Sequence, residues 1–244
     1  MTSKQVLLLT AAIAMISGCT LFWDRQGMSL ESPYPTRRVW AVAPLRNESG
    51  SVEADGWSMA DHLTRHLENA TNLDVLPVNR VLATMEKLRI AQVTNADQAQ
   101  QLLHSLRIDG LVVGTITAYD PYDPPKLGLA IELYANKKVE YHDAINVRQL
   151  SRAATAVGSL PEQPDLRQPV STVSAVFDAA HQDVQEKLKR YATGRGRPPD
   201  RGSWYRYRIS MDLYSEFVSY VMSWRLLWSE TQRIAPVTNQ PAPS

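Results

Sequence analysis

Two histidines and two aspartates are spaced closely enough to suggest shared chemistry. His62 and His66 are four residues apart, the spacing at which two imidazoles on one helix can bind a metal ion. Position 63 is not a glutamate and no third ligand follows, so the metalloprotease motif is not formed. On a helical wheel both rings lie beside an apolar arc that starts at Met59, and we expect them to be solvated border residues.

The remaining polar candidates give weaker signals. Asp120 and Asp123 share one loop, as paired active-site carboxylates do, but three interleaved prolines favour turn formation. Ser49 precedes a glycine but lacks the second glycine of a nucleophile elbow. Gly110 and Gly114 are not followed by the Lys-Ser/Thr of a phosphate loop, so we expect them to serve strand packing. The sequence therefore predicts no catalytic residue, metal ion or cofactor.

Cys19 is the one cysteine of the chain, which excludes an internal disulfide and a cysteine-cluster metal site. It follows Lys4 and an apolar run from Val6 to Ile16, which is shorter than the roughly 20 residues of a membrane span. The tetrapeptide Ile16-Ser-Gly-Cys19 resembles the lipobox of bacterial lipoproteins. That resemblance implies cleavage between Gly18 and Cys19, and a diacylglycerol thioether on the cysteine.

We therefore predict a signal peptide over residues 1–18 and a lipid-anchored tether over residues 19–36, which is polar and contains two prolines. There are two alternatives: an ordinary signal peptide that happens to contain a cysteine, and a buried N-terminal helix. Thr20 stands where an aspartate specifies inner-membrane retention in enterobacterial lipoproteins. The absence of aspartate at this position resembles the pattern of outer-membrane lipoproteins. We therefore expect the protein to be anchored in the outer membrane and to face the periplasm.

Charge is nearly balanced over the 244 residues, with 26 basic and 25 acidic side chains and a net charge of +1. Such a balance supplies no global field for a polyanion, so nucleic acid is not an expected partner. One basic cluster, Arg195, Arg197 and Arg201, precedes Trp204 and Tyr205. We interpret it as part of a soluble linker, with contact to phosphates or lipid headgroups as the alternative.

The hydrophobic pattern predicts an α/β fold: a mixed sheet with flanking helices, followed by one long C-terminal amphipathic helix. The α/β domain is predicted over residues 37–192, a flexible linker over 193–203 and a disordered tail over 235–244. The predicted strands are 38–44, 73–77, 110–119 and 127–135, with 144–150 a further candidate and 170–177 either strand or helix start. The predicted helices are 53–69, 78–88, one capped by Asn95, and 178–191.

The C-terminal helix, predicted over residues 204–234, carries the strongest periodic signal. Its apolar arc includes five aromatic residues that we take as candidate partner-binding positions: Tyr214, Phe217, Tyr220, Trp224 and Trp228. A soluble monomer rarely leaves such a stripe in water, so it must pack on its own domain, on a membrane surface or on a partner. The polar face mixes both signs of charge, which disfavours the membrane.

Two motifs carry a resemblance to known proteins: Val42-Ala-Pro-Leu-Arg-Asn-Glu-Ser-Gly50 and Asp109-Gly-Leu-Val-Val-Gly-Thr-Ile-Thr-Ala118. They are similar to a periplasmic α/β domain found in the curli-secretion channel lipoprotein, the N-terminal domain of the Tol-system β-propeller protein and the lipoprotein activator of penicillin-binding proteins. The match covers about residues 37–135, with Leu45 where phenylalanine is usual and Gly114 directly after Val113. The resemblance implies a binding or assembly domain and brings no catalytic residues.

The expected function is therefore a lipid-anchored, non-catalytic binding or assembly module of the bacterial envelope. Its partner would be another envelope protein or a second copy of the chain. Two alternatives stay open: a structural subunit of an envelope export assembly, and an envelope hydrolase without a recognisable motif.

Overall fold

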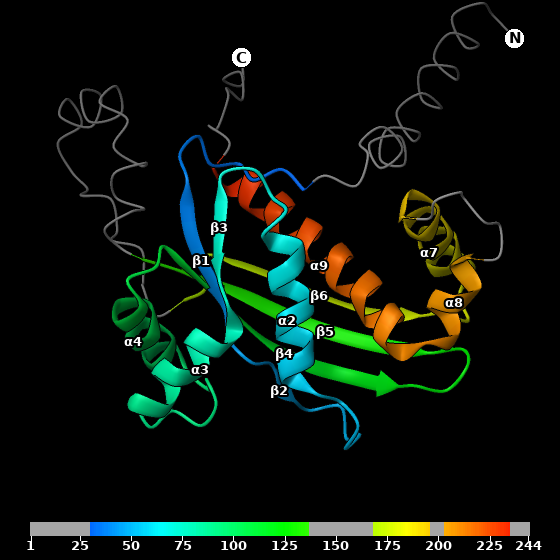
Figure 1. Ribbon diagram of the computed structural model, residues 1–244, viewed down its shortest axis with the longest axis horizontal. Helices are drawn as coiled ribbons and strands as arrows, with labels where there is room; N and C mark the ends of the chain where they lie inside the picture. The colour runs from blue at the N-terminus through cyan, green and yellow to red at the C-terminus, as the bar shows by residue number, and fades with distance from the viewer. Residues whose placement is uncertain (1–29, 137–167, 196–202, 235–244) are drawn as a thin grey trace, which may run out of the picture.

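The computed structural model describes residues 30–136, 168–195 and 203–234, which form a six-stranded mixed sheet with helices on both faces (Figure 1). This confirms the predicted fold class. The strands are β1 (Arg38–Val42), β2 (Arg46–Asn47), β3 (Leu73–Leu76), β4 (Gly110–Asp120), β5 (Lys126–Ala135) and β6 (Ser171–Asp178). The helices are α2 (Gly56–Leu67), α3 (Val78–Lys87), α4 (Ala96–Leu106), α7 (Gln182–Arg195), α8 (Ser203–Ile209) and α9 (Met211–Ile234).

The strand order is β3-β1-β4-β5-β6, with β2 beside the second half of β4. Strands β1, β3 and β4 are parallel, whereas β5 is antiparallel to both β4 and β6. The carboxyl ends of β1, β3 and β4 therefore lie at one end of the sheet, which we call the distal end. The chain enters β1 from Leu30 at the opposite end, which we call the near end (Figure 1).

Strand β4 is the centre of the sheet, as its continuous apolar run predicted. Its first seven residues are buried, and Val112 has no exposed surface. Gly114 allows close packing, because a Cβ there would lie 2.9 Å from Ile131 Cγ2 and 3.0 Å from Leu45 Cγ. The two strands predicted at 110–119 and 127–135 pair as an antiparallel hairpin, with Gly110 opposite Ala135 and Asp120 opposite Lys126.

Two apolar cores form because the sheet is covered on both faces. Helices α2 and α9 cover one face, where Trp40, Leu63 and Phe217 belong to the larger core. Helices α3 and α4 cover the other face over β1 and the start of β4, where Leu102 and Leu111 belong to the smaller core. Most helix boundaries follow local signals. The side chain of Asp55 accepts a hydrogen bond from the Trp57 amide at the start of α2, and Asn95 caps α4 as predicted.

The predicted C-terminal helix is two helices separated at Ser210, and α9 packs on its own domain. It lies against both β6 and α2, so it is buried on more than one side. Ser215, Ser219 and Ser223 lie on the polar side of its helical wheel, opposite the aromatic arc, but all three are buried. Small side chains allow α9 to approach α2 closely, and the Ser219 hydroxyl lies 3.3 Å from Met59 Sδ.

The structure corrects two other boundaries and decides one open assignment. The predicted tether is too long, because Leu30 and Tyr34 are buried in the larger core. Helix α7 extends to Arg195, beyond the expected domain end at residue 192. The ambiguous segment at 170–177 is strand β6. The signal segment, Gly18, Cys19, the candidate strand at 144–150 and the C-terminal tail lie outside the described residues. Among the described helices, none is both long and apolar enough to cross a membrane.

Candidate functional site

The two histidines do not form a metal site; they join α2 to α9. Both are buried, which corrects the expectation of solvated rings. His62 Nε2 lies 3.2 Å from Asp212 Oδ1, and His66 Nε2 lies 2.9 Å from the carbonyl oxygen of Glu216. The sequence could not show this, because the burial comes from α9, about 150 residues later. No group of three metal-binding side chains occurs within the three described ranges.

The protonation state of His62 follows from its partners. Arg65 lies 2.7 Å from His62 Nδ1, and a guanidinium can only donate, so Nδ1 accepts. The ring is therefore neutral with its proton on Nε2, which donates to Asp212. Burial is the main cause that lowers the pKa of His62, and the charge of Arg65 adds to it. The acidic neighbours Asp212 and Glu216 oppose this shift without reversing it.

The other polar candidates have structural partners. Asp120 Oδ1 accepts a hydrogen bond from the Tyr122 amide at 3.1 Å, which is the turn geometry predicted for this loop. Asp123 forms an ion pair of 2.8 Å with Arg208 of α8. The Ser49 hydroxyl donates to the Asn47 side chain at 2.7 Å. Their positions therefore give no sign of an active-site arrangement.

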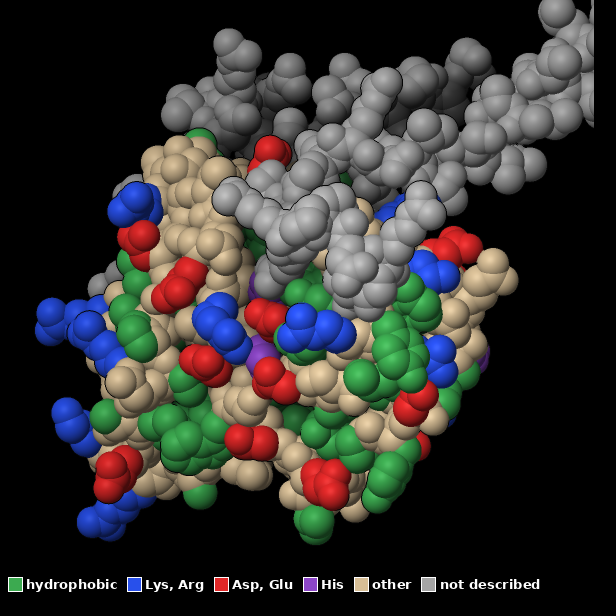
Figure 2. All heavy atoms as spheres, turned by 45° about the vertical axis from the view of Figure 1, so that its right-hand side comes forward, with side chains coloured by type: hydrophobic (Ala, Val, Ile, Leu, Met, Phe, Trp, Pro, Cys, Tyr) green, Lys and Arg blue, Asp and Glu red, His purple; other side chains and the backbone are tan. Residues whose placement is uncertain are grey.

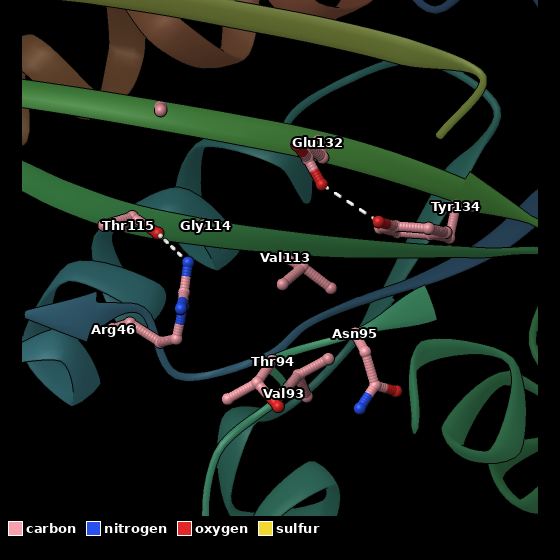
Figure 3. Close-up of a pocket in the computed structure, with 10 residues that line it drawn as sticks. Arg46, Val93, Thr94, Asn95, Val113, Gly114, Thr115, Glu132 and Tyr134 are labelled. Atoms are coloured by element: carbon pink, nitrogen blue, oxygen red, sulfur yellow. Dashed lines mark hydrogen bonds between the residues drawn. The ribbon is translucent and has the colours of Figure 1, made fainter. Parts of the chain in front are cut away.

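A small pocket lies where the α3–α4 loop meets the sheet, between Arg46 and Asn95 (Figure 3). Its volume is about 90 Å³, well below the roughly 300–1,000 Å³ of typical small-molecule sites. Arg46 donates to the Thr115 hydroxyl at 3.2 Å and pairs with Glu48 at 3.0 Å. Glu132 accepts a hydrogen bond from Tyr134 at 3.0 Å. The two charged side chains of the pocket, Arg46 and Glu132, thus already have partners within the protein.

A buried carboxylate joins three parts of the chain at the near end. Glu230 of α9 has no exposed side-chain surface and accepts hydrogen bonds from Tyr34, Ser171 and Arg233. Burial by itself raises the pKa of Glu230, but the bonds and charge of Arg233, with Ser171 and Tyr34, outweigh it and lower the pKa. Because these donors occupy the carboxylate, we interpret this Glu230 cluster as a structural junction rather than a reactive group.

The five aromatic candidates of α9 separate into different environments. Tyr214 and Phe217 are fully buried in the larger core. They therefore pack within the domain itself and have no surface for a partner. Tyr220 is half-buried, with its ring centroid 5.1 Å from that of Tyr191. The Trp224 and Trp228 rings stack at 6.0 Å, and Trp228 is 44% exposed.

Most exposed large apolar side chains lie elsewhere, at the distal end of the sheet. We define the distal face by five of them: Val52 (99% exposed), Trp57 (59%), Tyr122 (77%), Tyr205 (48%) and Ile209 (52%). They come from the loop before α2, the first turn of α2, the tip of the β4–β5 hairpin and helix α8. In Figure 1 these segments occupy the lower and right-hand parts of the molecule, away from the entry of the chain at Leu30.

Local structure positions these side chains outward. The loop that carries Val52 is held by Asn47, whose amide donates to the carbonyl oxygens of Ser51 at 2.7 Å and Ala54 at 3.1 Å. Trp57 is two residues before the buried Met59, which places it about 160° away on the wheel of α2. That angle was a usable sequence signal for an exposed tryptophan.

Three acidic side chains lie near the end of β4, beside the distal face. The pKa of Tyr119, at the end of β4, is raised mainly by burial and then by the negative charges of Glu53, Asp212 and Asp55. These three carboxylates therefore lie near the Tyr119 phenol. Two basic residues at this end have acidic partners: Arg208 pairs with Asp123 at 2.8 Å, and Lys126 pairs with Asp178 at 2.9 Å. In the lowest part of Figure 2, apolar and acidic side chains lie together, and the basic ones there are at the left margin.

The comparisons with known proteins identify partial structural likenesses. No family model and no curated protein matches the chain. The lipoprotein GNA1162 of Neisseria meningitidis is similar over 58% of this chain and 80% of its own, with 17% identity and a TM-score of 0.38. The hypothetical protein CT253 of Chlamydia trachomatis is similar over 80% of this chain and 98% of its own, with 11% identity and a TM-score of 0.38.

A third solved structure, PelC from Paraburkholderia phytofirmans, described as a dodecamer, is similar over 43% of this chain and 66% of its own. Its identity is 14% and its TM-score is 0.28. The chain is thus similar in part to a bacterial lipoprotein. The expected resemblance to the curli, Tol and penicillin-binding-protein activator group stays a prediction.

Proposed function

We propose that the protein is a lipid-anchored, non-catalytic binding module of the bacterial envelope, and that the distal face is its contact surface. One observation carries the proposal: five of the seven exposed large apolar side chains in the described ranges belong to segments at the end of the sheet opposite the entry of the chain (Figure 1). Large exposed apolar side chains on one part of a domain commonly mark an interaction site. The carboxyl ends of parallel strands are also where open α/β sheets commonly bind their ligands.

A lipid anchor on Cys19 would orient the domain relative to the membrane. Leu30 is already packed in the core, so about eleven residues link it to Cys19. At roughly 3.3–3.6 Å per residue, this segment spans at most about 40 Å. A lipid on Cys19 would thus keep the near end toward the membrane and leave the distal face pointing into the periplasm.

In-membrane photo-crosslinking tests the proposal. A photoreactive amino acid in place of Trp57 should give discrete higher-mass adducts in native membranes. The same amino acid at Glu86, an exposed position of α3, is the matched control and should give none. The adducts at position 57 should depend on anchoring and disappear with Cys19→Ala. Equal crosslinking from both positions, or none from position 57, would contradict the proposal.

A further inference from the structure

We infer that the distal face binds a cationic, apolar-containing segment of a protein partner, such as a strand or helix that presents lysine or arginine beside aliphatic side chains. This inference rests on the proposed function and specifies the chemistry of the partner. Its starting point is the apolar surface itself, because Trp57 and Tyr122 are too exposed to serve the protein's own core. Tryptophan and tyrosine are the residue types that most often dominate binding energy at protein interfaces.

The charges near this surface favour a positively charged partner. Glu53 is exposed, and its carboxylate acts on Tyr119 together with those of Asp55 and Asp212. The carboxylate of Asp55 accepts a hydrogen bond from the Trp57 amide, and that of Asp212 lies against the neutral imidazole of His62, so neither of these contacts is with a cation. By contrast, Arg208 and Lys126 are neutralised by ion pairs, and Arg206 of α8 is an exposed cation at the margin.

Complementary charge therefore favours a basic segment and disfavours an acidic one. The exposed aromatic rings add to this preference. The face of a tryptophan or tyrosine ring attracts an ammonium or guanidinium group within about 6 Å of its centroid. Trp57 is two residues after Asp55 and four after Glu53, so a partner cation over the indole would lie near the start of α2, where these carboxylates are. The apolar parts of the partner would contact Val52 and Tyr122.

Fluorescence anisotropy with the full lipidated chain in a neutral detergent tests the inference. The probe is a short fluorescein-labelled peptide of alternating lysine and leucine, and the matched peptide carries glutamate in place of lysine. We expect the lysine peptide to bind and the glutamate peptide not to bind. Binding should weaken when ionic strength is raised from about 0.05 to 0.5 M, because the charges are solvent-exposed.

Three substitutions locate the binding. Glu53→Lys should weaken binding by about tenfold, because it places a like charge at the site. Glu86→Lys makes the same charge change on α3 and should alter affinity less than twofold. Trp57→Ala should weaken binding, whereas Trp57→Phe, which keeps an aromatic face, should retain most of it.

Three outcomes would overturn the inference: no binding of the lysine peptide, equal binding of the glutamate peptide, or equal effects of the two charge reversals. If crosslinking from position 57 succeeds while the peptide test fails, the proposed function stands and the cationic partner is wrong. If the crosslinking fails as well, the distal face is not the contact surface.

Discussion

The phenol of Tyr34 donates a hydrogen bond of 2.5 Å to the buried carboxylate of Glu230, which lies 196 residues further along the chain. The backbone at Tyr34 is held as well, because the Asn72 side chain donates to its carbonyl oxygen at 3.1 Å. The first described residues are therefore part of the fold. Only the segment up to residue 29 is left to act as a tether.

Tyr34→Phe should lower the free energy of unfolding by about 1.5–3 kcal/mol. The substitution removes one hydrogen bond to a buried charge while Ser171 and Arg233 still donate to Glu230. Denaturant unfolding monitored by circular dichroism measures the change. Tyr122→Phe is the control, since that tyrosine is exposed and should be neutral. Equal stability of both variants would show that the bond does not contribute.

The free energy of unfolding should fall as the pH drops below about 6.5, in part because of His62. The folded protein lowers the pKa of this ring from 6.5, so it favours the neutral form. The contribution of neutral His62 is therefore complete above pH 6.5, and it is lost as the pH falls toward the lowered value. Unfolding curves at pH 8 and pH 5.5 measure this loss.

His62→Gln should reduce this pH dependence, because glutamine does not titrate in this range. His104→Gln, on the exposed side of α4, is the matched control and should behave as wild type. If the two variants show the same pH dependence, the ring of His62 is not the responsible group.

Cys19→Ala should release the protein from the membrane or leave the signal segment uncleaved. The alanine side chain has no thiol to accept a diacylglycerol group, and Cys19 is the one cysteine of the chain. Membrane fractionation and intact-mass analysis of the mature protein test this. An unmodified cysteine in the wild-type mass would refute lipidation and remove the orientation argument with it.

Val112→Asp should destabilise the domain by about 5 kcal/mol, comparable with the whole stability of a small domain. Val112 is fully buried in the first part of β4, opposite Val42 of β1 and Leu133 of β5, where a carboxylate would lie among apolar neighbours. Thr117→Asp on the same strand is the control, because Thr117 is exposed. Thermal unfolding should show a lost or strongly shifted transition for the first variant and a small shift for the second.

Local patterns predicted the sheet well, because the residues that decide it are close in sequence. The apolar run of β4, the loop before β5 and the cap at Asn95 each act within a few residues. The predicted element ends were off by up to four residues, as in α7, which was predicted over 178–191 and spans Gln182–Arg195. Helix α2 starts at Gly56, three residues after its predicted start, because Asp55 caps it there. The break at Ser210 was missed, because the apolar period continues across it.

The partner surface was harder to predict, because burial depends on which elements meet. The wheel of α9 separated an aromatic arc from a serine side, but α2 packs against the serine side. His62 and His66 were misjudged for the same reason, since the wheel of α2 cannot show that α9 covers them. One sequence signal did point to the distal face: Trp57 is a large apolar residue on the side of α2 opposite its buried residues.

The junction at Glu230 also determines how a mechanical load would enter the protein. A lipid anchor pulled away from the domain would act on the chain at Leu30, next to the Tyr34 contact and just before β1. Strand β1 lies between β3 and β4 and is parallel to both. A pull along β1 would shear its bonds to both neighbours at once rather than open them singly. The strand nearest the anchor is thus the one best placed to resist tension.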